Sequence, residues 1–316
     1  MKILRIIGRV VFIVIIFSML FCQRGDKIKE GPVIALVVKT MNNPFFIDMQ
    51  KGAEEAANKL GVNLLIQGAD REVDVEKQMQ IIENLIQRKV DVLCITPSGS
   101  REIVQSILKA NKAEIPVLIV DTRVAEDALE KAGGKVTSFI GSDNQEGGRI
   151  AGEYIINLLG GKGEIAVLEG IPGHETGDAR LRGLKAALSK APDVNIVVSL
   201  TANWERDQGF NVFQNILQSH PEVQALFACN DLMALGAIEA IEAAGKTGEI
   251  FVVGFDAVND ARNAMQLGAM HGSVAQYPYD MGKAAVEYGY RIIMGEAIPE
   301  EIPIRIGLIT KQNVAN

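Results

Sequence analysis

Aromatic residues, cysteine and histidine are scarce in this sequence. Its 316 residues include 11 Phe, 5 Tyr, 1 Trp, 3 Cys and 3 His. So few Cys and His leave little material for a metal site or a disulfide framework, and we expect neither. Basic residues are in deficit as well, with 32 Lys and Arg against 39 Asp and Glu and a net charge of −7. Nucleic-acid binding needs a basic face, so we expect no nucleic-acid partner.

Motifs that mark common enzyme classes are also missing. The chain contains no GxSxG, HExxH or GxxxxGK[ST] pattern. The glycine-rich stretch GIPGHETGDARLRG at 170–183 lacks the Lys-Ser/Thr pair of a phosphate-binding loop. Its His174, Glu175 and Thr176 offer polar contacts to a ligand, although a plain surface position is the simpler interpretation of His174. We therefore expect neither catalysis nor a cofactor.

The first thirty residues predict a targeting segment. Three basic residues precede the apolar run VVFIVIIFSMLF at 10–21, which has the length of a signal-peptide core and is short for a membrane span. Cys22 follows at once, as the acylated Cys does in bacterial lipoproteins, although Phe21 stands where that pattern prefers Gly, Ala or Ser. We predict a signal peptide over 1–21, lipidation of Cys22 and a polar tether over 22–31. A plain secretory signal or an uncleaved anchor is the alternative.

From Pro32 onward, short apolar runs alternate with amphipathic helical patterns, and the alternation occurs twice. The first series predicts strands at 33–38, 63–67, 90–96, 115–121 and 136–142. The second series predicts strands at 164–170, 194–200, 223–230 and 249–255. Strands that alternate with helices build right-handed βαβ units and a parallel sheet. The fold class is therefore α/β, and Cys94 and Cys229 at the ends of two runs are most simply core residues.

Polar residues follow most of these strands. They are Asn42, Asn43, Thr96, Asp121, Glu169, Asn230 and Asp256. In open parallel sheets, ligands bind in the crevice beyond the carboxyl ends of the strands. Two such sheets that face each other would place these loops on both sides of one cleft. The pattern therefore predicts a two-lobed binding protein.

Several long motifs carry a family resemblance. IALVVKTMNNPFF, FIGSDNQEGGRIAGEY, HPEVQALFACNDLMALGAIEAIEAAGK, VVGFDA and SVAQYPYDMGKAA stand in this order. Together they resemble the periplasmic ribose-binding proteins and, more broadly, the type I periplasmic receptors of bacterial sugar ABC transporters, from about residue 32 to 312. The resemblance implies two Rossmann-like lobes with parallel sheets, joined by a three-crossover hinge. It divides the chain into 32–142 plus 277–305 and 143–276 plus 306–316.

The resemblance also implies ligand-binding residues in the first lobe. Asn43 matches an Asn that binds sugar hydroxyls, and otherwise it is a turn residue before Pro44. Phe45 and Phe46 match aromatic residues that cover the apolar face of the sugar ring, and otherwise they anchor the core. Asp121 matches a carboxylate that accepts from hydroxyls, and otherwise it caps a helix.

In the second lobe the resemblance implies contacts from two loops and one helix. Arg180 matches an Arg that donates to the sugar, with Arg182 as its competitor. Trp204 stands where the ribose receptor has Phe, and we expect it to stack on the ring. Asn230 matches a ligand-binding Asn, whereas Asp231 is interpreted as the cap of the next helix.

The last two matches lie further along the second lobe. Asp256 matches a ligand-binding Asp, and Gln276 matches a Gln that contacts ligand near the hinge. Phe255, which precedes the Asp, is expected to pack.

Two positions depart from the ribose receptor. Thr96 replaces an Asn, and Thr122 replaces an Arg, with Arg123 one place further on. Losing an Arg removes a fork of donors, so the ligand can be a pentose other than ribose, a hexose or a polyol. Both threonines stay in the predicted contact set.

The resemblance implies a binding protein that hands its sugar to a membrane permease at the cell envelope. We expect a periplasmic or surface location, an N-terminal lipid anchor and a monomer. A sensor role, in which bound sugar is presented to a chemoreceptor or a kinase, is the alternative. Sugar-responsive repressors share the two-lobed body but carry an N-terminal helix-turn-helix, and here a signal segment occupies that place.

Overall fold

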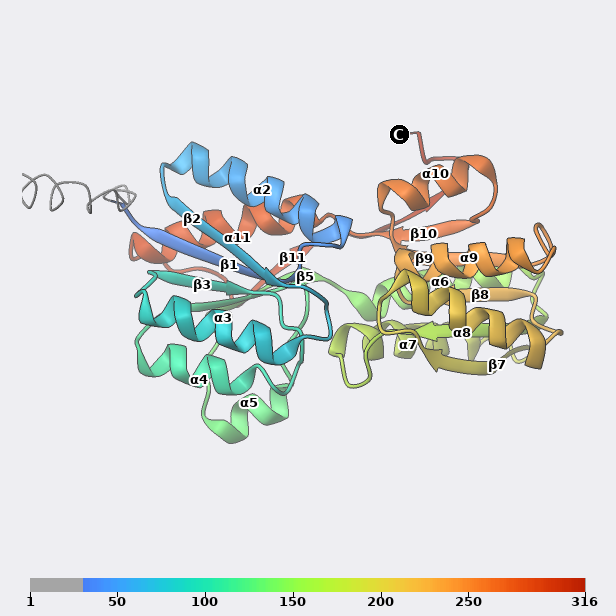
Figure 1. Ribbon diagram of the computed structural model, residues 1–316, viewed down its shortest axis with the longest axis horizontal. Helices are drawn as coiled ribbons and strands as arrows, with labels where there is room; N and C mark the ends of the chain where they lie inside the picture. The colour runs from blue at the N-terminus through green and yellow to red at the C-terminus, as the bar shows by residue number, and fades with distance from the viewer. Residues whose placement is uncertain (1–30, 316) are drawn as a thin grey trace, which may run out of the picture. The chain divides into compact units, whose positions relative to one another are not determined.

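The computed structural model describes residues 31–315, and residues from Pro32 onward form one compact unit (Figure 1). The predicted signal peptide, Cys22 and all of the tether but its last residue lie outside the described residues. None of the helices in 31–315 has the length and apolar character that a membrane crossing requires. The described chain is built on two six-stranded sheets.

The first sheet is entirely parallel. Its strand order is β11 (Glu301–Ile304), β5 (Ser138–Ser142), β4 (Val117–Val120), β3 (Val92–Ile95), β1 (Val33–Thr40) and β2 (Asn63–Ala69). Its central strands are uninterrupted apolar runs, as strands covered on both faces must be.

Five helices belong to this sheet. α2 (Pro44–Leu60) and α11 (Pro278–Ile293) lie far apart in the sequence but side by side in space, and they bury one face of the sheet (Figure 1). α3 (Val75–Gln87) and α4 (Val104–Lys112) bury the other face, with α5 (Glu126–Ala132) beside α4. The apolar faces of these helices therefore form a core on each side of the sheet.

The second sheet repeats this plan with one reversed edge strand. Its order is β12 (Gly307–Thr310), β10 (Gly272–Ala275), β9 (Phe251–Asp256), β8 (Ala225–Ala228), β6 (Gly163–Glu169) and β7 (Val194–Thr201). Only β12 is antiparallel to its neighbour. The helices of this lobe are α6 (Asn144–Leu158), α7 (Glu175–Leu188), α8 (Arg206–Ser219), α9 (Asp231–Ala243) and α10 (Asn259–Leu267).

The chain crosses between the sheets three times. The crossings follow β5, β10 and β11, so β11 joins the first sheet and β12 the second. The predicted α/β fold of two Rossmann-like lobes with three crossovers is confirmed. The residue-level lobe limits, 32–142 plus 277–305 and 143–276 plus 306–316, stay a prediction.

Close helix packing in the second lobe depends on glycine. A Cβ on Gly148 of α6 would lie 2.0 Å from the carbonyl oxygen of Arg180, and one on Gly183 of α7 would lie 1.9 Å from that of Gln145. Only glycine lets the two backbones approach so closely. This contact fixes the turn of α7 that carries Arg180.

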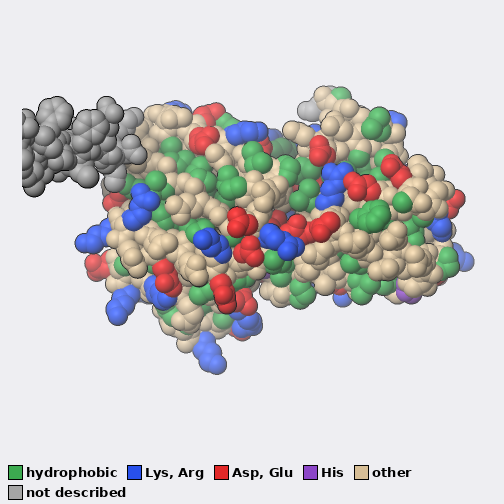
Figure 2. All heavy atoms as spheres, in the orientation of Figure 1, with side chains coloured by type: hydrophobic (Ala, Val, Ile, Leu, Met, Phe, Trp, Pro, Cys, Tyr) green, Lys and Arg blue, Asp and Glu red, His purple; other side chains and the backbone are tan. Residues whose placement is uncertain are grey.

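On the face of the described residues drawn in Figure 2, acidic and basic side chains are interspersed, with hydrophobic side chains scattered between them. Many of the charged residues are paired, as in the pairs Arg101–Asp127 and Arg206–Glu239. Exposed pairs of this kind contribute little to stability, so the fold depends mainly on its cores.

Candidate functional site

A small buried cavity lies between the lobes, beyond the carboxyl ends of both sheets. It encloses about 20 Å³, which is room for about one water molecule. Residues of both lobes line it: Lys39, Asn43, Phe45, Phe46, Glu72, Asp121, Thr176, Arg180, Trp204, Asn230, Asp256 and Gln276. The structure thus brings nine of the eleven predicted ligand-binding residues to one place.

The first-lobe wall is centred on a buried lysine. Lys39 sits at an irregularity in the β1–β2 register, and such bulges redirect a side chain. Its ammonium lies 3.3 Å from Asp121 Oδ2 and 3.9 Å from Glu72 Oε2. Burial nevertheless raises the pKa of Glu72 to about 7, because the favourable charge of Lys39 only partly offsets the desolvation.

Asn43 holds the start of α2 and reaches into the cavity. Its Oδ1 accepts a hydrogen bond from the backbone N–H of Phe45 at 3.0 Å, and its Nδ2 donates to Glu72 at 2.9 Å. Pro44 is the first residue of the helix, where its missing N–H costs nothing. Phe45 and Phe46 therefore lie in the first helical turn, not in a loop, and their rings pack edge to face at 5.2 Å.

The second-lobe wall is centred on Arg180. Its Nε donates to Asn144 Oδ1 at 2.9 Å, and its Nη1 donates to the carbonyl of Cys229. The guanidinium also lies 3.8 Å from Asp256 and 3.7 Å from the ring centre of Phe255. Burial raises the pKa of Asp256 to about 6, although the charge of Arg180 opposes the shift.

Two further second-lobe residues hold each other in place. Asn230 caps α9, because its Oδ1 accepts from the N–H of Met233, and its Nδ2 donates to the carbonyl of Trp204 at 3.1 Å. Trp204 packs on Gly170, where a Cβ would lie 1.9 Å from the indole ring. The indole is 3% exposed, and its Nε1 is a buried donor without a partner among the described residues.

A second unpaired polar atom belongs to Gln276, which also lines the cavity. Gln276 donates from Nε2 to Asp256 at 2.8 Å, while its buried Oε1 has no partner in the described chain. Buried polar groups are normally paired, so each of these atoms has room for a partner such as a water molecule or a ligand. The free donor of Trp204 and the free acceptor of Gln276 match the two hydrogen-bonding capacities of a hydroxyl group.

Backbone strain is concentrated at this cavity. Asp121, Trp204 and Asp256 have φ values of 64°, 69° and 108°. Each such conformation costs a residue other than glycine about 1–3 kcal/mol and is retained mainly at functional sites. The strain is consistent with side chains held in a fixed geometry for a ligand.

The sequence matches the family described as periplasmic binding protein domain over residues 34–297. The chain belongs to this family. It is 38% identical over 279 residues to the ribose import binding protein RbsB of Escherichia coli K12, covering 88% of this chain and 90% of that protein. It is 37% identical over 254 residues to the D-allose-binding periplasmic protein of the same organism, covering 80% and 82%.

The fold is also similar to a solved family structure. That structure is an ABC transporter solute-binding protein from Actinobacillus succinogenes 130z with bound D-allose. The TM-score is 0.85 at 37% sequence identity, covering 90% of this chain and 99% of the other. The periplasmic binding protein fold of this chain is therefore shared over nearly all of the described residues.

Sequence reasoning missed two residues that line the central cavity of this chain, Lys39 and Glu72. Lys39 is part of a strand, and Glu72 lies among the charged residues of the β2–α3 loop, which resembles a solvated surface. Glu72 follows the carboxyl end of β2, so the rule that singled out the other strand-end residues would have found it.

Three predictions from the second lobe are settled by contacts. The surface interpretation of His174 is wrong, because its side chain is 1% exposed. The capping interpretation of Asp231 is also wrong: its carboxylate accepts from Val258 N and Ser273 Oγ, while Asn230 caps the helix. Phe255 packs as expected and is fully buried.

Thr96 and Thr122 lie outside the cavity lining. Thr96 is fully buried, and its hydroxyl lies 4.0 Å from the sulfur of Met49. Thr122 donates to Asp121 Oδ2 at 2.9 Å and so lies behind the cavity wall. Cys94 and Cys229 are buried free cysteines, in agreement with their predicted core positions.

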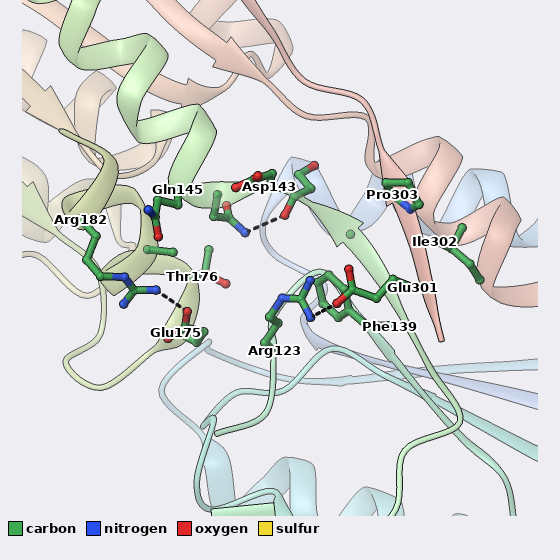
Figure 3. A pocket seen from close by; sticks show the side chains of 14 residues that line it. Arg123, Phe139, Asp143, Gln145, Glu175, Thr176, Arg182, Glu301, Ile302 and Pro303 are labelled. Carbon is green, nitrogen blue, oxygen red and sulfur yellow. Dashed lines mark hydrogen bonds and ion pairs between the residues drawn. The ribbon is translucent and has the colours of Figure 1, made fainter. Parts of the chain in front are cut away.

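A larger cavity of about 330 Å³ lies at the hinge (Figure 3). Two ion pairs line it: Arg123 donates to Glu301 and Arg182 to Glu175. Thr176 lines this cavity as well as the central one. Because the central cavity gathers nine of the predicted ligand-binding residues from both lobes, we take it as the candidate ligand site. Neither Arg123 nor Arg182 lines the central cavity.

Proposed function

We propose that this chain is the extracytoplasmic substrate-binding protein of an ABC importer, which holds a monosaccharide or polyol between its lobes and delivers it to a membrane permease. One observation carries the proposal. Buried donors, buried carboxylates and aromatic rings from both lobes converge on a single cavity at the carboxyl ends of two sheets. A sugar presents hydroxyls that donate and accept, and ring faces that are apolar, so this lining is complementary to it.

Each lobe supplies part of the contact set. From the first lobe, Asn43, Lys39 and the carboxylates of Glu72 and Asp121 face the ligand, with Phe45 and Phe46 covering one side. The second lobe supplies Arg180, Trp204, Asn230, Asp256 and Gln276. A ligand that bridges the two walls binds the closed lobes better than the open ones and shifts the population toward closure.

The central cavity is too small to hold a sugar as it stands. A space of about 20 Å³ admits one water molecule, so a sugar enters only when the lobes separate or the lining side chains turn. The three crossovers are the only covalent links between the two sheets in the described chain, and they are the natural axis for this motion.

The relatives narrow the ligand class. A ribose import binding protein, a D-allose-binding protein and a structure holding D-allose are among them. We infer that the ligand is an aldopentose or aldohexose and place D-ribose and D-allose first. Lys39 and Glu72 add one buried donor and one buried acceptor to the predicted set, and these suit a ligand with an additional hydroxyl.

We propose binding without catalysis. No Ser, Cys or His is among the described residues that line the cavity, so the lining has no hydroxyl or thiol nucleophile of the Ser–His or Cys–His kind. The one hydroxyl, that of Thr176, donates to Thr122. We expect bound sugar to be recovered unchanged after prolonged incubation, as judged by carbon NMR.

Location and anchoring are part of the proposal. We propose a periplasmic or surface-attached monomer, held to the membrane by a lipid on Cys22 after removal of 1–21. Detergent phase partitioning of the protein from its host provides the test. The wild-type chain should enter the detergent phase, and Cys22→Ser should stay in the aqueous phase. Equal partitioning of the two would remove the anchor from the proposal.

Calorimetric titration tests the central proposal. The chain is first unfolded and refolded to remove co-purified sugar, and then titrated with D-ribose, D-allose, D-xylose, D-galactose, D-fructose and myo-inositol. One-to-one binding of at least one of these sugars is expected, with loss of binding in Asp256→Ala. A protein that melts cooperatively but binds none of them would overturn the assignment to simple sugars.

A further inference from the structure

Three consecutive residues at the start of α7 reach across to the first lobe. His174 Nε2 lies 2.9 Å from the carbonyl oxygen of Ser98. The backbone N–H of Glu175 donates to Ser100 Oγ at 3.2 Å, and Thr176 Oγ1 donates to Thr122 Oγ1 at 2.9 Å. Their partners lie in the loops that follow β3 and β4. This segment, residues 174–176, is called the clasp below.

The residues that make the clasp contacts are mostly buried. His174 and Thr176 are 1% and 4% exposed, and Ser98 and Thr122 are fully buried. Desolvation, followed by the positive charge of Lys39, lowers the pKa of His174 to about 3, so the ring is neutral at pH 7. Because a carbonyl only accepts, the ring proton is assigned to Nε2.

The clasp is linked to the ligand site by a chain of hydroxyls. Thr176 donates to Thr122, and Thr122 donates to Asp121 Oδ2 at 2.9 Å. The same oxygen, Asp121 Oδ2, also accepts a hydrogen bond from the ammonium of Lys39 at 3.3 Å. Figure 3 shows Thr176 beside Glu175, on the side of the hinge cavity opposite the Arg123–Glu301 pair.

We propose that Thr176 is a positioning residue for ligand binding: through Thr122 it orients the Asp121 carboxylate only when the lobes are closed, and the clasp stabilises that closed arrangement. When the lobes separate, the donor of Thr176 leaves and Thr122 is free to turn away from Asp121. The second lobe thereby controls a first-lobe ligand contact. Thr176 lines the central cavity, whereas Thr122 and His174 do not. Thr122→Val therefore tests the hydroxyl chain apart from a direct contact of Thr176 with the sugar, and unchanged affinity in Thr122→Val would overturn the positioning role.

Calorimetry with D-ribose and D-allose tests the hydroxyl chain in the full-length protein. Thr176→Val keeps the side-chain shape and removes the donor, and we expect Kd to rise about 3- to 10-fold, the range of one hydrogen bond. Thr176→Ser restores the hydroxyl and should return Kd to within about twofold of wild type. Thr122→Val should resemble Thr176→Val, and the double variant should be no worse than either, because both remove one chain.

Thr247→Val is the matched control, since Thr247 is exposed and lies in the turn after α9. Its Kd should equal that of the wild type. Unchanged affinity in Thr176→Val, or fully additive losses in the double variant, would overturn the positioning role.

Amide hydrogen exchange tests the clasp without relying on the proposed sugar binding. We expect residues 96–101 and 171–176 to exchange faster in His174→Ala and Thr176→Val than in the wild type and in Thr247→Val. Unchanged exchange in both segments would overturn the clasp. If none of the six sugars named under the proposed function binds the wild type, that function fails, while the exchange result still decides whether the clasp exists.

Discussion

The guanidinium of Arg180 lies 3.7 Å from the ring centre of Phe255. The side chain is also fixed by donation to Asn144 and to the carbonyl of Cys229. A planar cation stacked on an aromatic ring loses little further freedom when it binds a ligand. The fully buried Phe255 therefore supports the guanidinium of Arg180, which we propose as a ligand contact.

We predict that Arg180→Lys binds sugar almost as poorly as Arg180→Ala. Lysine keeps the charge but has neither the plane that stacks on Phe255 nor the fork of donors. Loss of a buried, charge-assisted contact weakens binding by about 2–5 kcal/mol, which is at least about 30-fold in Kd. Calorimetry measures the affinity, and circular dichroism checks that the variants are folded.

Arg182→Ala is the matched control, because this neighbouring arginine is exposed and pairs with Glu175. Its affinity should stay within about twofold of wild type. A large loss of affinity in Arg182→Ala, together with full binding in Arg180→Lys, would show that Arg182 and not Arg180 contacts the ligand.

The raised pKa of Glu72 leads us to predict that the free energy of unfolding depends on pH. Burial raises its pKa from 4.5 to about 7, so between these values the folded protein holds a proton that the unfolded chain has released. The free energy of unfolding therefore falls as pH rises through this window. We expect Glu72→Gln to remove roughly 2 kcal/mol of the decrease between pH 5 and pH 7.5.

Urea unfolding of both proteins at the two pH values measures this difference. Asp256, with its pKa raised to about 6, contributes a decrease of the same sign in both proteins, so only part of the slope should disappear. Identical slopes in the wild type and in Glu72→Gln would show that Glu72 does not titrate in this range.

The strand positions could be predicted because a short, continuous apolar run is stable in a strand whose sheet is covered by helices on both faces. Cys94, for example, lies in a run that becomes β3, and it is fully buried. The sheet to which each strand of the last sixty residues belongs was harder to predict. Hydrophobic periodicity does not show that β11 joins the first sheet and β12 the second. Their assignment depends on where the chain crosses the hinge, which is a tertiary property.

Residues whose role depends on the other lobe could not be predicted from local sequence. His174 has the sequence surroundings of a surface loop, but it is buried, and its Nε2 lies 2.9 Å from the carbonyl oxygen of Ser98 in the first lobe. Lys39 required knowledge of a register irregularity that redirects its side chain. Strand-end residues such as Asp121 and Asp256 were found, because the carboxyl edge of a parallel sheet is defined by the strand pattern alone.

Asn230 combines two roles that a pair of substitutions should separate. We predict that Asn230→Ala loses both sugar binding and about 1 kcal/mol of stability, because it removes the α9 cap. Asn230→Ser keeps a capping oxygen but loses the amide, which donates to Trp204. It should retain most of the stability and lose at least about tenfold in affinity.

Urea unfolding and calorimetry on the two variants check this separation. Equal loss of stability in Asn230→Ser and Asn230→Ala would mean that the hydroxyl does not replace the amide oxygen as a cap. Full affinity in Asn230→Ser would remove the amide from the ligand contacts.

Trp204 provides an intrinsic signal for the same site. It is the only tryptophan in the sequence, it lines the central cavity, and its Nε1 has no partner among the described residues. A sugar hydroxyl placed against this donor would change the polarity around the indole, so we expect its emission to shift on binding, with a midpoint equal to the calorimetric Kd. Trp204→Phe should abolish the signal and weaken calorimetric binding by about fivefold, the worth of one hydrogen bond. Emission that stays constant at a sugar concentration saturating by calorimetry would place the ligand away from the indole, and the second-lobe wall would then have to be reassigned around Arg180 and Asp256 alone.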